Sequence, residues 1–157
     1  MKTLITFLTF LLITSSISFA KGEIVNNFLV GINDTSSNYN DGIYVAKSRG
    51  KYTSEPFWGH IQLTVEKGAF TNIKFTIRDS TTHEEVDSMY GVKHYSAIPE
   101  YMKQCVNDGH GIETYPQRLL QTQNLDKVDG ISGATWSYNI FKSTTTEALK
   151  NGKITGV

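Results

Sequence analysis

The residues with the clearest chemical potential form a short run near the C-terminus. Residues 129–137 read Asp-Gly-Ile-Ser-Gly-Ala-Thr-Trp-Ser and lead into a segment with helical periodicity. A turn of this kind exposes backbone N–H groups and the positive end of a helix dipole, which together favour a bound phosphate. Gly133 and Ala134 let a ligand approach the backbone closely, and Ser132, Thr135 and Ser137 supply hydroxyl groups. The same residues also suit an ordinary capped helix start, in which Ser132 or Thr135 accepts a hydrogen bond from a following N–H.

The helix that follows this run is predicted from Trp136 to Lys150. Its apolar side chains fall within one broad arc of a helical wheel, which is typical of a helix with one buried face. Those side chains belong to Trp136, Ile140, Phe141, Thr144 and Ala148. The dipeptide Asn151-Gly152 is a typical helix end. The hydroxyl run is therefore expected at the N-terminus of a C-terminal helix.

Two strands with alternating apolar residues are predicted in the first half of the chain. Their apolar positions are Ile61, Leu63 and Val65 in the first strand and Ile73, Phe75 and Ile77 in the second. Lys67-Gly68 lies between them and suits a tight turn, so we expect an antiparallel hairpin with one apolar face. A shorter strand is expected before it, where Ile43 and Val45 alternate with Tyr44 and Ala46.

Helices are expected to cover the apolar face of this hairpin. Pro99 suits a first helical turn and Gly109 a helix end, and Pro116 is predicted to open a second short helical segment around Leu119 and Leu120. Strands followed by helices indicate an α+β fold. We therefore expect a twisted antiparallel β-sheet packed by helices, with the hydroxyl run at the start of the last helix.

Composition narrows the class of protein. The chain has 157 residues, of which 39% are hydrophobic and 19% charged, which is typical of one globular domain. Its 15 basic residues balance 15 acidic ones, so it lacks the basic excess that nucleic-acid binding uses, and no nucleic acid is expected as a partner.

Cys105 is the single cysteine, so no internal disulfide is expected, and a buried filler is favoured over a reactive thiol. The four histidines are scattered, which argues against a structural zinc site.

The N-terminus is predicted to direct export. Residues 1–20 combine Lys2, an apolar run and the small-residue pattern Ser18-Phe19-Ala20, which is typical of a cleaved secretory signal peptide. An uncleaved membrane anchor is the alternative. Residues 21–40 are expected to be a linker or an extra strand, and residues 41–157 the folded domain. A periplasmic or extracellular location follows, with or without association to a membrane.

The hydroxyl run and the strands before it resemble the FMN-binding domain family. That family includes flavin-carrying domains of the sodium-pumping NADH:quinone oxidoreductase and of Rnf complexes, as well as many small exported flavoproteins. The resemblance spans residues 41–153, from Asp41-Gly42-Ile43-Tyr44 through the Lys67-Gly68 hairpin to the final helix. The family's flavinylation motif is Asp, two variable residues, Ser or Thr, Gly, Ala, then Thr or Ser. Residues 129–135 match every defined position.

The resemblance implies a covalent cofactor. The hydroxyl of Thr135 would accept FMN through a phosphoester bond, installed from FAD by an exported flavin transferase. The phosphate-side turn would consist of Ser132, Gly133 and Ala134, and Gly130 would also belong to the cofactor-binding residues. Asp129 would be read by the transferase or would fix the turn, with a plain turn residue as the alternative. Ser137 would bond the phosphate or the helix start, and Trp136 would either pack in the core, which is favoured, or stack near the flavin.

One segment departs from the family pattern. The quinone-reductase and Rnf relatives carry a Glu-Thr-Pro-Gly-type segment after the hairpin that contacts the flavin, whereas residues 80–91 of this chain read Ser-Thr-Thr-His-Glu-Glu-Val-Asp-Ser-Met-Tyr-Gly. Met89 or Tyr90 could flank the ring, although packing is the favoured role for each. The ring pocket is therefore left open by the sequence.

Three functions of different classes are compatible with these features. The leading hypothesis is an exported electron carrier, which relays electrons between a membrane redox donor and an extracytoplasmic redox partner. The second is a flavin-dependent reductase of a small acceptor, which would need an acceptor site with Arg or His; Arg49, Arg78 and Arg118 are dispersed and give it little support. The third is a non-redox interaction or sensing module, against which the complete acceptor motif argues.

Overall fold

The computed structural model describes residues 39–151 and 153–154. The predicted signal peptide and most of the predicted 21–40 segment lie outside the described residues. Of that segment, Tyr39 belongs to the folded domain, because its ring lies 5.5 Å from the ring of Phe70 and 6.5 Å from that of Tyr44. Asn40 accepts a hydrogen bond from the Tyr44 hydroxyl at 2.7 Å.

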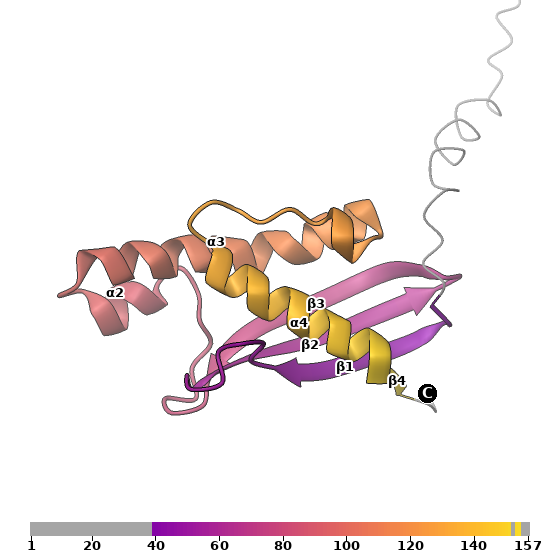
Figure 1. Cartoon of the computed structure of the whole chain (residues 1–157), viewed down its shortest axis with the longest axis horizontal. Coiled ribbons are helices and arrows are strands. Elements are labelled where there is room, and N and C mark those ends of the chain that lie inside the picture. The colour runs from indigo at the N-terminus through magenta and orange to yellow at the C-terminus, as the bar shows by residue number, and fades with distance from the viewer. Residues whose placement is uncertain (1–38, 152, 155–157) are drawn as a thin grey trace, which may run out of the picture. The chain divides into compact units, whose positions relative to one another are not determined.

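A four-stranded antiparallel sheet forms one layer of the domain, in the order β3-β2-β1-β4. The strands are β1 (Gly42–Ser48), β2 (Phe57–Glu66), β3 (Ala69–Asp79) and β4 (Lys153–Ile154). The last is a two-residue edge strand beside β1. Helices α3 (Pro99–Thr122) and α4 (Thr135–Asn151) form the second layer, with the short helices α2 (Tyr90–Tyr95) and η1 (Leu125–Lys127) beside them (Figure 1).

The predicted hairpin is confirmed. Strands β2 and β3 pair with Leu63 opposite Ile73, and their predicted apolar residues are buried against the helices. Lys67 and Gly68 both have positive φ, at 53° and 74°. Two consecutive positive φ angles are those of a type I′ turn, whose twist matches that of the flanking strands.

Strand β1 is also confirmed, and the structure adds which face of it is buried. Tyr44 and Ala46 point towards the core, whereas Val45 is exposed. Both sets of side chains are apolar, so their alternation in the sequence did not show which set is buried. In the structure the side of the strand that carries Tyr44 is buried, and the Tyr44 hydroxyl donates to the backbone carbonyl of Asn40.

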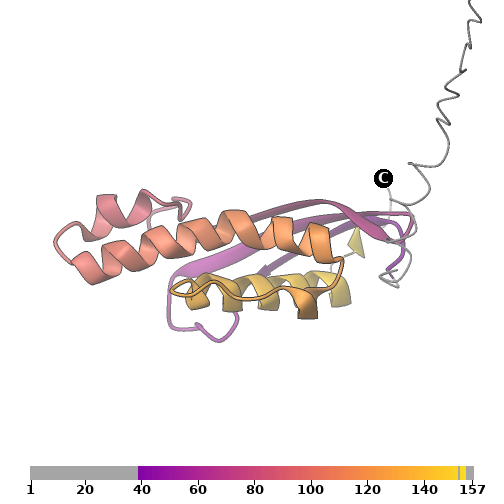
Figure 2. The ribbon, with the colours of Figure 1, turned by 90° about the horizontal axis from the view of Figure 1, so that it is seen from above.

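Both long helices lie on the same face of the sheet (Figures 1 and 2). Helix α3 packs along β3, and α4 packs on β1 and β2. Phe141 of α4 meets Phe75 of β3 edge-on, with ring centroids 5.1 Å apart. An antiparallel sheet with helices on one face is an α+β fold, so the predicted fold class is confirmed.

The prediction that a helix ends at Gly109 and another begins at Pro116 is wrong. A single 24-residue helix, α3, runs from Pro99 through both residues to Thr122. Gly109 is needed for packing, because a Cβ there would lie 2.6 Å from the backbone nitrogen of Ser88. Pro116 is buried inside the helix, where tertiary packing outweighs the lost hydrogen bond.

The predicted C-terminal helix is confirmed as α4, which begins at Thr135 and ends at Asn151. Four of its predicted apolar-arc residues, Ile140, Phe141, Thr144 and Ala148, are fully buried. In the described part of the chain, no helix has the length and apolar character needed to cross a membrane.

Candidate functional site

The turn that leads into α4 presents one side to solvent. Ser132, Gly133 and Thr135 are exposed, and no described residue forms a hydrogen bond with the Thr135 hydroxyl. The backbone N–H groups of Thr135 and Trp136 also have no partner among the described residues, as is usual for the first turn of a helix. This side therefore combines a free hydroxyl with N–H donors at the positive end of a helix.

The other side of the turn is held by a buried tyrosine of α3. The Tyr115 side chain is 0% exposed. Its hydroxyl donates to the carbonyl of Ala134 at 2.9 Å and accepts from the N–H of Ile131 at 3.2 Å. One side chain thus fixes both ends of the segment that carries Ser132 and Gly133. Ala134 itself is buried beneath the exposed residues.

A buried carboxylate of α3 caps the start of α4. Asp108 is 2% exposed, and its Oδ1 accepts from the Ser137 N–H at 3.0 Å and from the Ser137 hydroxyl at 2.7 Å. Burial raises the pKa of Asp108, and the hydrogen bonds from Ser137 oppose that shift. The Ser137 hydroxyl is therefore engaged inside the fold, at the helix start, which is one of the two roles left open by the sequence.

Gly133 is the position in the turn where the backbone requires glycine. Its φ of +81° is costly for any residue with a Cβ. A Cβ there would also lie 2.6 Å from Nδ2 of Asn107 on α3. The close approach of the turn to α3 thus depends on the missing side chain.

The first two motif residues, Asp129 and Gly130, are exposed. The carbonyl of Asp129 accepts from Arg118 Nη1 at 2.7 Å, which ties the beginning of the turn to α3. The carboxylate of Asp129 is on the surface, where it can help to fix the turn or meet another protein. The geometry leaves both predicted roles open.

Polar residues of α3 line a shallow hollow beside Thr135. The hollow has a volume of about 320 Å³, and its lining consists of Glu100, Lys103, Gln104, Asn107, Gly133, Thr135 and Trp136. Four of these recur at i, i+3, i+4 and i+7 along α3, so they form one stripe on that helix. Among these lining residues, Lys103 is the only cation.

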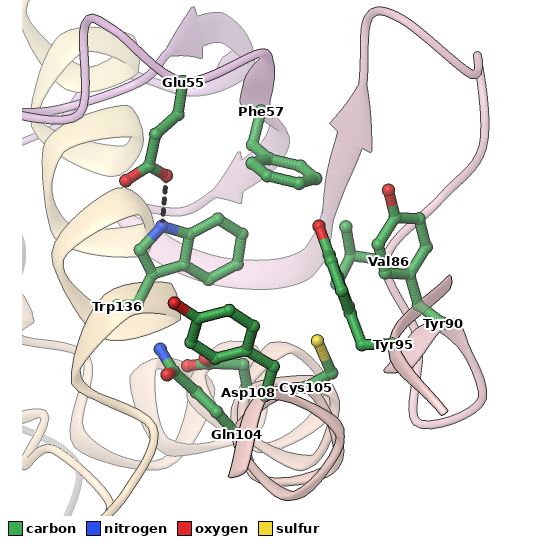
Figure 3. A pocket seen from close by; sticks show the side chains of 10 residues that line it. Glu55, Phe57, Val86, Tyr90, Tyr95, Gln104, Cys105, Asp108 and Trp136 are labelled. Atoms are coloured by element: carbon green, nitrogen blue, oxygen red, sulfur yellow. Dashed lines mark hydrogen bonds between the residues drawn. The ribbon is translucent and has the colours of Figure 1, made fainter. Parts of the chain in front are cut away.

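A second, aromatic cavity adjoins this hollow. It has a volume of about 210 Å³, and Figure 3 shows side chains from several elements converging on it. Phe57 comes from β2, Tyr90 and Tyr95 from α2, and Tyr101 from α3. The remaining lining residues are Glu55, Val86, Gln104, Cys105, Asp108 and Trp136.

Trp136 and Gln104 line both hollows and so stand between them. The Trp136 indole N–H donates to Glu55 Oε2 at 2.8 Å, and its ring meets Phe57 edge-on with centroids 5.2 Å apart (Figure 3). Trp136 is half-buried. It therefore packs against the domain, which is the role the sequence favoured, and also forms a wall of the aromatic cavity.

Tyr90 is held in the cavity wall by a buried carboxylate. Its hydroxyl donates to Asp79 Oδ2 at 2.7 Å. Burial alone would raise the pKa of Asp79, but hydrogen bonds from Tyr90, Thr81 and Thr82 outweigh it and lower that pKa. Burial and the bond to Asp79 raise the pKa of Tyr90. Met89, the other ring-flanking candidate, is 61% exposed and does not line the cavity.

Cys105 lies in the same wall and is partly buried. Burial, followed by the nearby charge of Asp108, raises the pKa of the Cys105 thiol. The thiol form is therefore favoured over the reactive thiolate. This environment agrees with the filler role expected from the sequence.

Sequence reasoning missed most of the cavity. Phe57, Tyr95 and Tyr101 come from three separate elements, and no spacing in the sequence connects them. The polar stripe of α3 did carry a signal, because residues 100, 103, 104 and 107 share one helical face. The helix that presents these residues was predicted to end at Gly109, whereas α3 continues to Thr122.

Comparisons with known proteins place the chain in a family. The family model described as "FMN-binding domain" matches residues 56–150, which include both hollows except Glu55. No curated protein matches the chain. The crystal structure of the CPE2226 protein from Clostridium perfringens resembles it with a TM-score of 0.56 at 22% identity, covering 73% of this chain and 88% of that one. That likeness shows a shared fold, and the family match shows that this chain belongs to the FMN-binding domain family.

Proposed function

We propose that this protein is an exported electron carrier in which FMN is bound to Thr135 through a phosphoester. The observation that carries the proposal is the exposed, unbonded Thr135 hydroxyl at the start of α4, inside a complete flavinylation motif and next to an aromatic cavity. Membership of an FMN-binding family supports the flavin. The predicted signal peptide supports export.

Attachment would be carried out by a flavin transferase that uses FAD. In this reaction the Thr135 oxygen forms a bond to the phosphorus of the FMN half, the pyrophosphate bond breaks, AMP leaves and the hydroxyl proton is released. Thr135 is exposed, so an enzyme can reach it without unfolding the domain. The buried bonds of Tyr115 and Asp108 meanwhile hold the turn that presents it.

The phosphate side of the site fits the residues present. The unbonded N–H groups of Thr135 and Trp136 belong to a helix N-terminus, which favours an anion by about 0.3–1 kcal/mol. Lys103 lines the same hollow as Thr135. The diester keeps one negative charge, which these groups would balance.

The aromatic cavity suits the flavin ring. A group anchored at Thr135 reaches this cavity past Trp136 and Gln104, which line both hollows. Phe57 and Tyr90 supply aromatic surface, which excludes water and favours a planar ring. When bound, FMN supplies reversible redox chemistry, and a phosphate tether leaves its ring free of covalent bonds to protein.

An electron carrier is favoured over a reductase because, among the described residues, no arginine or histidine lines the cavity. The three arginines considered from the sequence donate to backbone carbonyls instead: Arg49 to Glu55, Arg78 to His83 and Arg118 to Asp129. A reductase of an anionic acceptor would be expected to place such groups over the ring.

Coexpression with and without a flavin transferase tests the proposal. We expect flavin fluorescence on a denaturing gel only when the transferase is present, followed by reversible reduction and reoxidation of the purified protein. Saturable turnover of one small acceptor would show that the protein is a reductase and not an electron carrier. A protein without flavin beside an active transferase would contradict covalent attachment.

A further inference from the structure

The face of the sheet opposite the helices has no covering layer among the described residues (Figure 2). Strand alternation places Val45 and Lys47 of β1 on this open face, and the paired residues of β2 and β3 lie beside them. The cross-strand rows are Val45, Gln62 and Lys74; Lys47, His60 and Thr76; and Trp58 with Arg78. Two hollows, of about 530 and 290 Å³, lie over these rows.

This surface is basic, although the whole chain has no net charge. Lys47, Lys74 and Arg78 are exposed on it, and none of the three forms a salt bridge with another described residue. The strand positions in these rows contain no carboxylate, and the exposed Glu85, which forms a β-bridge with Arg78, stands at the end of the third row. Burial, followed by the charges of Lys47 and Arg78, lowers the pKa of His60, and the charge of Glu85 opposes that shift.

Trp58 orders the cations at one end of this surface. Lys47 Nζ lies 4.4 Å and Arg49 Cζ 4.2 Å from the centre of its ring. These cation–π contacts hold two long side chains in place without neutralising them. Ordered cations lose less conformational entropy on binding than mobile ones.

The mixture of side chains favours a protein as the partner. Tryptophan and arginine are enriched at the centres of protein interfaces, and Val45, 38% exposed, adds apolar surface beside them. Lys47, Lys74 and Arg78 are spaced by the register of paired strands, so they suit a partner with a fixed surface. Lys47 and Lys74 form no salt bridge with a described residue, and the cations of this surface outnumber its carboxylate Glu85, so an acidic partner surface complements it.

We propose that the open face of the sheet, centred on Lys47, Trp58, Lys74 and Arg78, is the docking surface for a protein partner with an acidic surface. The site does not depend on the flavin. It does have a consequence for the carrier proposed above: Phe57 and Trp58 are consecutive in β2, and Phe57 lines the aromatic cavity on the other face. A partner docked here would sit one sheet thickness from that cavity.

A binding measurement with charged probe proteins tests this docking surface. The probe is a negatively supercharged fluorescent protein, and its positively supercharged counterpart is the control. Binding to the full-length protein is measured at low and at high salt, with and without the attached flavin. We expect the negative probe to bind in both forms, to weaken steeply with salt, and the positive probe not to bind.

Charge-reversal variants locate the site. We expect Lys47→Glu with Lys74→Glu to weaken binding of the negative probe by at least about tenfold, because each exposed cation contributes to steering and contact. The matched control, Lys127→Glu with Lys150→Glu, changes the net charge equally at exposed positions on η1 and α4. It should lose much less affinity. Thermal unfolding of all variants checks that each is folded.

Three results would overturn the proposal. One is an equal loss in both double variants, which would make the attraction a property of net charge. Another is no binding of the negative probe at low salt. The third is tight binding of vesicles of anionic phospholipid that Lys47→Glu with Lys74→Glu abolishes, without binding of the protein probe. Failure of flavin attachment leaves all of these measurements intact, so the two proposals fail separately.

Discussion

Thr135 and Ser137 are hydroxyl residues two positions apart on the same turn, and they have opposite surroundings. Thr135 is exposed and its hydroxyl has no partner among the described residues. Ser137 is 0% exposed, and its hydroxyl and N–H both donate to the buried carboxylate of Asp108. In a sequence the two residues look equivalent as phosphate ligands.

The difference shows that the turn has an exposed side and a supporting side. The exposed side carries Ser132 and Thr135, the second of which is the proposed attachment site. The supporting side consists of buried contacts from α3, through Asp108 and Tyr115, that hold the turn in one conformation. Substitutions should therefore separate loss of the cofactor from loss of stability.

The largest effect is expected at Thr135. Thr135→Ala should abolish covalent flavin while changing the free energy of unfolding by less than about 0.5 kcal/mol, because an exposed side chain without partners is removed. In-gel flavin fluorescence and thermal unfolding measure the two quantities. Thr135→Ser should restore attachment, since the hydroxyl returns. Retained covalent flavin in Thr135→Ala would erase the distinction between the two sides.

The opposite pattern is expected at Asp108. Asp108→Ala leaves the buried N–H of Ser137 without an acceptor and removes the shorter of the two bonds of its hydroxyl, which also donates to the Ala134 carbonyl. The free energy of unfolding should fall by about 2–3 kcal/mol. Chemical denaturation measures this loss. The folded fraction should still accept flavin at Thr135. Unchanged stability would show that Asp108 does not support the turn.

A smaller loss is expected from Tyr115→Phe. The substitution keeps the buried ring and removes the hydroxyl that joins Ala134 and Ile131, which should cost about 1–2 kcal/mol of stability. The same denaturation experiment gives the value, and Tyr101→Phe provides a control at an exposed tyrosine. If both variants lose equal stability, the two hydrogen bonds of Tyr115 contribute little.

The smallest effect is in the pH dependence. Because the pKa of Asp108 is raised above its ordinary 3.8, the folded state binds the Asp108 proton more tightly than the unfolded state does. The proton-linked part of its stabilisation is therefore full below pH 3.8 and is lost as pH rises through the pKa of the folded state, whereas its hydrogen bonds to Ser137 are a separate contribution. Asp79 has a lowered pKa, so its contribution is present above pH 3.8 and is lost as pH falls through the folded value.

Stability measured against pH for Asp108→Asn and Asp79→Asn checks these signs. The excess stability of the unsubstituted protein should shrink with rising pH relative to Asp108→Asn and grow relative to Asp79→Asn. Parallel curves for the two variants would mean that the opposite environments of these buried carboxyls have no energetic consequence.

The elements fixed by local pattern were predictable. Alternation at Ile61, Leu63 and Val65 and the positive-φ turn at Lys67-Gly68 specify the hairpin, and the small residues before α4 specify its start. The continuity of α3 was not predictable, because Gly109 allows a close contact with Ser88 and Pro116 is buried inside the helix, and neither fact can be read from the local sequence.

The candidate site also has one part that could be predicted from the sequence and one part that could not. The turn could be found because its residues are consecutive, and the resemblance to a flavinylation motif supplied a role for Thr135. The aromatic cavity could not, because Phe57, Tyr90 and Tyr101 converge only through tertiary packing. The burial of Ser137 was equally hidden, since its acceptor lies 29 residues away on α3.

The most direct test of the central claim is the intact mass of the protein after coexpression with a flavin transferase, followed by peptide mapping. We predict a mass gain of one FMN less one water, located on Thr135 and absent from Thr135→Ala. An unmodified chain beside an active transferase would contradict it, and so would the same mass gain located on Ser132 or Ser137.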